Sequence, residues 1–178
     1  MSRNRLFFIM FISFFLLNSC KSVPKNILPV KNFDLEQYMG KWYEIARLDF
    51  LYERGMSNIT ANYSLDENGN IQVVNTGYNT RQYKWKKATG KAKPCGNPLE
   101  GALKVSFFGP FYSDYTVLAV DSNYSYALVG GKDYSLLWFL ARKPEVPENI
   151  KNQFVDMAKN LGYETDSLIW TEHNTIYQ

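Results

Sequence analysis

Eight short segments rich in β-branched and aromatic residues follow one another between residues 41 and 141, with only a few residues separating them. Such segments are typical of β-strands, because branched and aromatic side chains pack well on a pleated surface. The pairs Asn68-Gly69 and Gly130-Gly131 predict tight hairpin turns. The predicted strands are residues 41–50, 57–65, 70–79, 82–93, 101–108, 113–121, 124–130 and 134–141.

Connections of this length join antiparallel neighbours, so the segments predict an antiparallel meander. A meander of eight strands can remove its exposed edges by closing on itself. The interior of a barrel of this size is just wide enough for one small ligand. The pattern therefore predicts an all-β fold, an up-and-down barrel that could enclose a small molecule.

One amphipathic helix is predicted near the C-terminus, at residues 147–161. Ile150, Phe154, Met157 and Leu161 recur at helical spacing, and Gly162 supplies a stop signal. We expect this apolar stripe to pack on the outside of the barrel. A short final strand is expected at residues 168–170, and a capped helical turn is expected just before the first barrel strand.

Three separated motifs carry a family resemblance: Gly40-Lys41-Trp42 at the first strand, Ser113-Asp114-Tyr115 near the middle, and a single Arg142 after the last barrel strand. In this order and spacing they resemble the lipocalin family, and in particular its bacterial outer-membrane lipoproteins, over about residues 33–171. The resemblance implies an eight-stranded lipocalin barrel with Trp42 at its closed end and Arg142 packed across the indole. The structural signature residues are Gly40, Trp42, Asp114, Tyr115 and Arg142.

The N-terminus has the features of a secretory signal, with Arg3 and Arg5 before a short apolar run that ends at Cys20. Leu-Asn-Ser-Cys resembles the bacterial lipobox, in which the cysteine is acylated. The alternative is ordinary cleavage that leaves Cys20 as an incidental thiol. The predicted organisation is a signal peptide at 1–19, a lipidated tether at 20–31 and a lipocalin domain at 32–178.

Acylation of Cys20 has two consequences. By analogy with well-studied envelopes, Lys21 after that cysteine favours the outer membrane, with the domain expected in the periplasm. Cys95 would have no partner for a disulfide within the chain, because the chain has two cysteines.

Alternation of side chains along the strands predicts which residues face the barrel lumen. Lys104 and Ser106 point outward by this reasoning, which turns their neighbours inward. The predicted ligand-binding residues are Val73, Leu103, Val105, Phe107, Tyr115, Val117, Tyr126, Leu128 and Trp138. For each of them taken singly, ordinary packing is the favoured alternative.

Two charged features have alternative interpretations. Glu44 shares the parity of Trp42, so it could pair with a Tyr or Arg near the base or orient a ligand headgroup. Lysines concentrate on the arm formed by residues 81–93. They could protect a strand edge from aggregation or rest on anionic lipid.

The function predicted from these features is binding, storage or transport of an apolar or amphiphilic ligand, of the fatty acid or lysophospholipid class. Catalysis finds no support, because the only histidine, His173, lies near the C-terminus and no metal-ligand cluster or phosphate-binding loop is present in the sequence. No cofactor or metal is expected, and the charge balance does not favour nucleic acid. The alternatives are a filled barrel that acts through protein partners and a lipocalin-fold enzyme. The oligomeric state is left open, a homodimer included.

Overall fold

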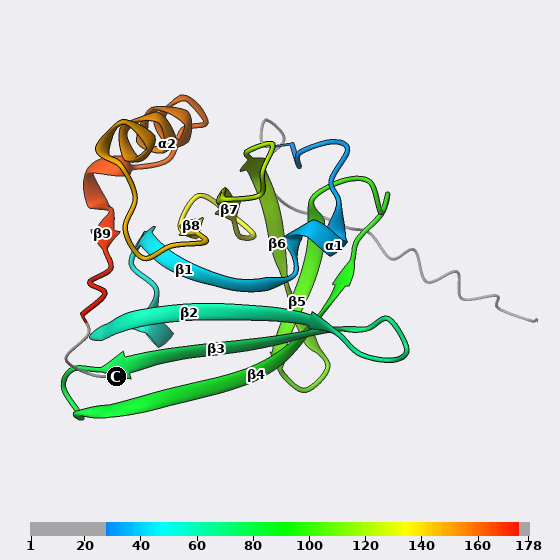
Figure 1. The fold of residues 1–178 in the computed structure, drawn as a ribbon, viewed down its shortest axis with the longest axis horizontal. Coiled ribbons are helices and arrows are strands. Elements are labelled where there is room, and N and C mark those ends of the chain that lie inside the picture. Colours follow the sequence, from blue (N-terminus) through cyan, green and yellow to red (C-terminus); the bar gives the residue numbers. More distant parts are fainter. Residues whose placement is uncertain (1–27, 175–178) are drawn as a thin grey trace, which may run out of the picture.

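The computed structural model describes residues 28–174, which form an antiparallel barrel with one long helix on its outside (Figure 1). The predicted fold class is confirmed. The strands run in the order β2-β3-β4-β5-β6-β7-β8-β1-β9, and pairing between β1 and β2 closes the ring. The barrel strands are β1 (Gly40–Arg47), β2 (Met56–Leu65), β3 (Ile71–Asn79), β4 (Lys84–Pro94), β5 (Ala102–Phe108), β6 (Phe111–Val120), β7 (Tyr126–Gly130) and β8 (Leu137–Ala141).

The C-terminal segment completes the wall where β1 and β2 separate. β1 pairs with β2 only from Gly40 to Tyr43, and its second half pairs with the short strand β9 (Ile169–Trp170). Beyond β9, the Thr171 amide donates to the Ile45 carbonyl at 2.9 Å. The predicted final strand is therefore present, and it covers the free edge of β1.

Two apolar cores lie on opposite faces of the sheet. The inner core fills the barrel and includes Trp42, Leu103 and Val117. The outer core lies beneath the helix α2 (Glu148–Asn160), where Phe154 stacks on Phe139 with ring centroids 4.3 Å apart. The helix thus packs on the outside of the barrel, as expected. Both cores are formed within the described residues.

The two ends of the barrel differ. The chain enters at one end, which we call the closed end, where the short helix α1 (Leu35–Tyr38) is capped by Asp34. The Val30 amide already donates to the Val117 carbonyl at 2.9 Å there. The opposite end, which we call the mouth, carries the β1–β2 loop with its 3-10 helix η1 (Leu51–Glu53), the β3–β4 turn and the β5–β6 turn.

Candidate functional site: the barrel lumen and its mouth

Trp42 and Arg142 seal the closed end. Trp42 is fully buried, and the Arg142 guanidinium carbon lies 3.7 Å from the indole centroid. The guanidinium donates to the carbonyls of Tyr124, Lys41 and Gln37 at 3.0, 3.0 and 2.7 Å. Gly40 has a φ of +93°, and a Cβ atom there would lie 3.4 Å from Arg142 Nη1. Glycine at position 40 therefore fits both the turn and the close approach of the arginine.

Three tyrosines form a hydrogen-bonded cluster just above Trp42, inside the barrel. The Tyr115 hydroxyl lies 2.7 Å from the Tyr38 hydroxyl and accepts from Tyr63 at 2.8 Å. Burial raises the pKa of all three phenols, that of Tyr63 to about 12. The cluster therefore stays protonated at physiological pH and gives the base of the lumen a polar floor.

The wall formed by β2, β3 and β4 has a row of small or polar residues on its inner face. Ala61 packs against the inner core, and it pairs across the sheet with Asn75, which pairs in turn with Ala88. Cross-strand partners share a face, so all three residues face inward. Asn75 Oδ1 is buried without a hydrogen-bond partner. A ligand hydroxyl or a water molecule could satisfy this acceptor.

A buried charged cluster lies between the lumen and the mouth loop. Arg47 Nη1 lies 2.7 Å from Glu44 Oε1, and Arg47 Nη2 donates to the Glu53 backbone carbonyl at 2.8 Å. Trp138 donates its indole N–H to the Glu53 carboxyl at 3.1 Å. The observed geometry matches the pairing interpretation of Glu44, since an arginine and Thr171 hold its carboxylate.

The protonation of this cluster follows from its burial. Desolvation, with a smaller contribution from the Glu44 charge, raises the pKa of Glu53 to about 8. Burial also raises the pKa of Glu44, against the opposing effect of Arg47. At neutral pH Glu53 is therefore mostly uncharged, and Glu44 is the carboxyl group in direct contact with the Arg47 guanidinium.

Two predicted lumen residues lie on the wrong face. The Tyr126 ring lies 6.3 Å from Phe154 of α2, and Leu128 belongs to the outer core beneath that helix. Their neighbours Ala127 and Val129 face the lumen instead. This strand is apolar on both faces, because the helix covers its outer face, so alternation in the sequence gave no reliable signal of direction.

The other predicted ligand-binding residues belong to the inner core or pack against it. The buried ones are Val73, Leu103 and Val117. The partly buried ones are Val105, Phe107, Tyr115 and Trp138. Among the signature residues, Asp114 faces outward and its carboxylate pairs with Lys104 at 2.7 Å. Sequence reasoning missed Arg47, Glu53 and Asn75, although a charged residue inside an apolar strand was a usable signal for Arg47.

His173 does not lie in a free tail. Its Nε2 is 2.7 Å from the Glu44 carbonyl oxygen, and its ring meets Tyr43 edge to face at 5.4 Å. Burial lowers its pKa. Within residues 28–174, no group of three or more histidine, cysteine or acidic side chains could hold a metal ion.

Several sequence expectations concern residues at the N-terminus. Cys20, the signal segment 1–19 and most of the tether lie outside the described residues. Cys95, in the loop after β4, is disulfide-bonded in the structure. The expectation that Cys95 has no disulfide partner applies to a chain acylated at Cys20 and stays a prediction. In the part of the chain described, no helix has the length and apolar character needed to cross a membrane.

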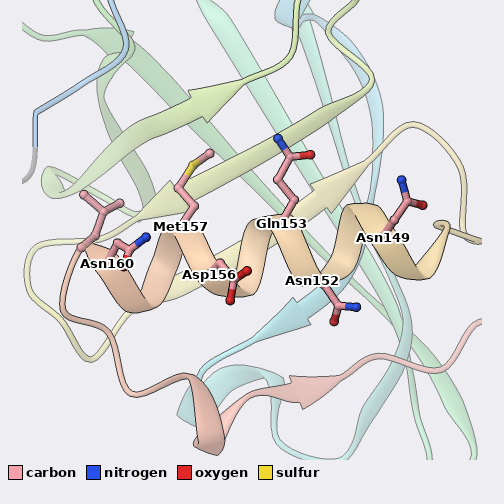
Figure 2. A pocket seen from close by; sticks show the side chains of 7 residues that line it. Asn149, Asn152, Gln153, Asp156, Met157 and Asn160 are labelled. Carbon is pink, nitrogen blue, oxygen red and sulfur yellow. The ribbon is translucent and has the colours of Figure 1, made fainter.

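A surface hollow runs along α2, away from the lumen (Figure 2). Five of its seven lining residues have polar side chains, and the hollow is open to solvent. It is lined by Asn149, Asn152, Gln153, Asp156, Met157, Asn160 and Leu161. Nothing in this lining resembles an apolar binding site, so the barrel interior remains the candidate site.

A family model described as a lipocalin-like domain matches residues 33–173. The chain belongs to the lipocalin family. The match spans β1 through β9 and includes Trp42 and Arg142, the two residues that seal the closed end. The chain is also similar in fold to insecticyanin from the tobacco hornworm, with a TM-score of 0.70 and 21% identity over 84% of this chain and 85% of that one.

Bacterial relatives are much more similar in sequence. The outer membrane lipoprotein Blc of Vibrio cholerae is 46% identical over 158 residues, which cover 88% of this chain and 92% of the relative. The protein of the same name from Escherichia coli K12 is 43% identical, covering 89% and 90%. These relatives place the chain among the lipid-anchored lipoproteins of the outer membrane, as predicted.

Proposed function

We propose that this lipocalin binds a single-chain amphiphile, of the fatty acid or lysophospholipid class, in its barrel lumen and stores or transports it within the cell envelope. The role is binding without chemical conversion of the ligand. Membership of the lipocalin family supports a hydrophobic ligand in general. The residues inside the barrel support the narrower choice of class.

The observation that carries the proposal is the change in lumen lining from base to mouth. Bulky side chains such as Trp42 and Tyr38 are fully buried at the base. Above the base the inward residues Ala61, Asn75 and Ala88 form a row of small side chains across β2–β4, and Ala88 is exposed although it faces the lumen. This row leaves room for an acyl chain, because none of its three residues has a bulky side chain, whereas Met56 and Ile59 lie over Gly77 nearer the mouth.

Transfer of the hydrocarbon from water supplies the affinity. Burial of apolar surface contributes about 25 cal/mol per Å², so one acyl chain can contribute several kcal/mol. The headgroup would stay near the mouth, within reach of the Asn75 amide and the Arg47–Glu53 cluster. A single chain fits better than two, because the tyrosine cluster and Trp42 already occupy the base.

Fluorescence titration with oleic acid and with lysophosphatidylethanolamine tests the proposal. The test protein is the mature chain with Cys20→Ser, which keeps every described residue. We expect saturable binding in the micromolar range or tighter, reported by Trp138. Ala88→Phe places a ring on the inner face and should weaken binding by roughly 10-fold or more.

The matched control is Thr89→Phe, which adds a ring at the next position of the same strand, on its outer face. This variant should bind as the parent does. Equal binding by both variants would place the ligand elsewhere. The absence of binding in a folded parent protein would favour a filled barrel that acts through protein partners.

We also propose that Cys20 carries the lipid anchor and that the domain faces the periplasm. The supporting observations are the lipobox-like Leu-Asn-Ser-Cys sequence and the relatives named as lipoproteins. Cys20 and Cys95 are the only two cysteines. An acyl chain on the Cys20 sulfur and a disulfide within the chain therefore exclude one another in one molecule.

Maleimide labelling of the membrane fraction separates these two states. In denatured, unreduced protein, acylation of Cys20 leaves the Cys95 thiol available, so one label per chain is expected. A chain with an internal disulfide takes no label until it is reduced. Mass measurement of the N-terminal peptide provides an independent check, and an unmodified Cys20 peptide from the mature protein would refute the anchor.

A further inference from the structure

Large apolar side chains gather at the mouth, where they contribute little to either core. We call this set the rim: its exposed fractions are 66% for Leu51, 67% for Tyr52, 80% for Tyr83, 48% for Trp85, 66% for Phe108 and 78% for Phe111. They come from three hairpin connections that meet at one end of the barrel. Clusters of exposed apolar side chains mark interaction surfaces more often than isolated ones do.

Contacts link the loops that carry the rim. The rings of Tyr52 and Phe108 lie 5.8 Å apart, which joins the β1–β2 loop to the β5–β6 turn. The Thr80 amide donates to the Gly55 carbonyl at 2.9 Å, which joins the same loop to the β3–β4 turn. The rim therefore surrounds part of the opening through which a ligand would pass.

Tyr83 shows that the rim is not explained by fold stability. This residue lies in the β3–β4 turn with a φ of +52°, a left-handed conformation that suits Gly or Asn better than an aromatic residue. Its ring is the most exposed of the rim, so the strained backbone is not compensated by burial. A bulky residue held in this way is consistent with a binding role.

Positive charge accompanies the aromatic residues. Arg81, Lys84, Lys86 and Lys87 flank Tyr83 and Trp85, and all four are exposed. β4 pairs with β5 only from Lys91 to Pro94, so this part of the strand belongs to an arm that extends beyond the β4–β5 ladder (Figure 1). Tyrosine and tryptophan prefer the headgroup region of a bilayer, and lysine and arginine are attracted to anionic lipids.

We propose that the rim and its flanking cations form a docking surface for an anionic lipid bilayer, which places the mouth against the membrane for ligand exchange. The purpose of docking rests on the proposed function, although docking itself can be measured without a lumen ligand.

The length of the tether allows the mouth to reach the membrane. The ten residue-to-residue steps from Cys20 to Val30 reach at most about 35 Å, close to the roughly 33 Å length of a ten-residue strand.

Vesicle co-sedimentation of the mature Cys20→Ser chain tests the proposal without the anchor. Vesicles of phosphatidylethanolamine with phosphatidylglycerol are compared with vesicles of phosphatidylcholine alone. We expect clear binding to the anionic vesicles. The Tyr83→Asn/Trp85→Thr variant should lose roughly 10-fold in affinity for the anionic vesicles. The triple variant Lys84→Glu/Lys86→Glu/Lys87→Glu should lose at least as much, and its loss should be confined to the anionic vesicles.

Matched controls are Leu99→Thr, an exposed apolar residue of the β4–β5 loop at the closed end, and Lys159→Glu on the exposed side of α2. Both should bind vesicles as the parent does. Tyr83→Asn relieves the turn, whereas Trp85→Thr removes an edge-to-face contact with Tyr78. Thermal unfolding of each variant shows whether a loss of binding accompanies a loss of stability.

The outcomes separate this proposal from the proposed function. If the rim variants bind vesicles as the parent does, the docking proposal is wrong. Their binding of lysophosphatidylethanolamine tests only the proposal that the lumen holds the ligand. A parent chain that docks but binds no amphiphile would overturn the lumen proposal alone. Sedimentation could also show that the parent is a dimer and that the rim variants are monomers. If vesicle binding is then the same in parent and variants, the rim is a contact between copies of the chain and the docking proposal fails.

Discussion

The guanidinium carbon of Arg142 lies 3.7 Å from the centre of the Trp42 ring, and the same side chain donates to three backbone carbonyls from three separate segments. One cation thereby joins α1, the start of β1 and the β6–β7 turn. The contact combines cation–π attraction with directional hydrogen bonds. A flexible ammonium group cannot reproduce both.

Arg142→Lys should therefore lower the free energy of unfolding by about 1–2 kcal/mol, and Arg142→Ala by about 2–3 kcal/mol. Urea titration followed by Trp fluorescence measures the change. The neighbouring Lys143 is exposed, and Lys143→Ala should change stability by less than about 0.5 kcal/mol. If the Lys143 and Arg142 variants behaved alike, the guanidinium contact would contribute nothing.

Tyr115 occupies the middle of the tyrosine cluster, so its hydroxyl should matter more than either neighbouring hydroxyl. Tyr115→Phe leaves the buried hydroxyls of Tyr38 and Tyr63 both without their partner. We expect a loss of about 1–3 kcal/mol in the free energy of unfolding. Tyr63→Phe leaves the other pair intact and should cost less. The reverse order in urea titrations would show that the cluster is not arranged as described.

Glu53 should make stability depend on pH. Its folded pKa is about 8, above the usual value of 4.5, so between these values the folded state binds a proton that the unfolded state has lost. Stability should therefore fall as pH rises through this window and level off above about pH 8. His173 adds an opposite slope only below its ordinary pKa of 6.5.

The test compares the stability of the parent and of Glu53→Gln between pH 6.5 and 8. The parent should lose up to about 2 kcal/mol across this range, and the glutamine variant should lose less, because only Glu44 then remains as a buried carboxyl with a raised pKa. Urea titrations at several pH values provide the measurement. Parallel curves for the two proteins would mean that Glu53 is ionised throughout the window.

Leu128 tests the assignment of β7 side chains to the outer face. Leu128→Ala should destabilise the protein by about 2–5 kcal/mol, because it opens a cavity beneath α2. The dissociation constant for oleic acid should stay unchanged when measured on the folded variant. A large loss of affinity without unfolding would return this residue to the lumen.

The sequence determined much of the fold. The Asn68-Gly69 signal and the spacing of the strand segments located turns correctly, because turn geometry depends on a few local residues. The tight hairpin predicted at Gly130-Gly131 is wrong, because residues 131–136 separate β7 from β8. The amphipathic helix was predicted within one residue at each end, at 148–160 instead of 147–161. The lipocalin motifs indicated the family, and the helical stripe correctly indicated packing outside the barrel.

The tertiary structure alone decided which face each side chain occupies where strands are irregular. A register shift between Glu44 and Ala46 lets Ile45 and Ala46 both join the outer core and turns Arg47 inward. Alternation predicts direction only along an unbroken strand with one polar face, a condition that β7 does not meet. The charged cluster and the rim likewise depend on loops far apart in the sequence, which only closure of the barrel brings together.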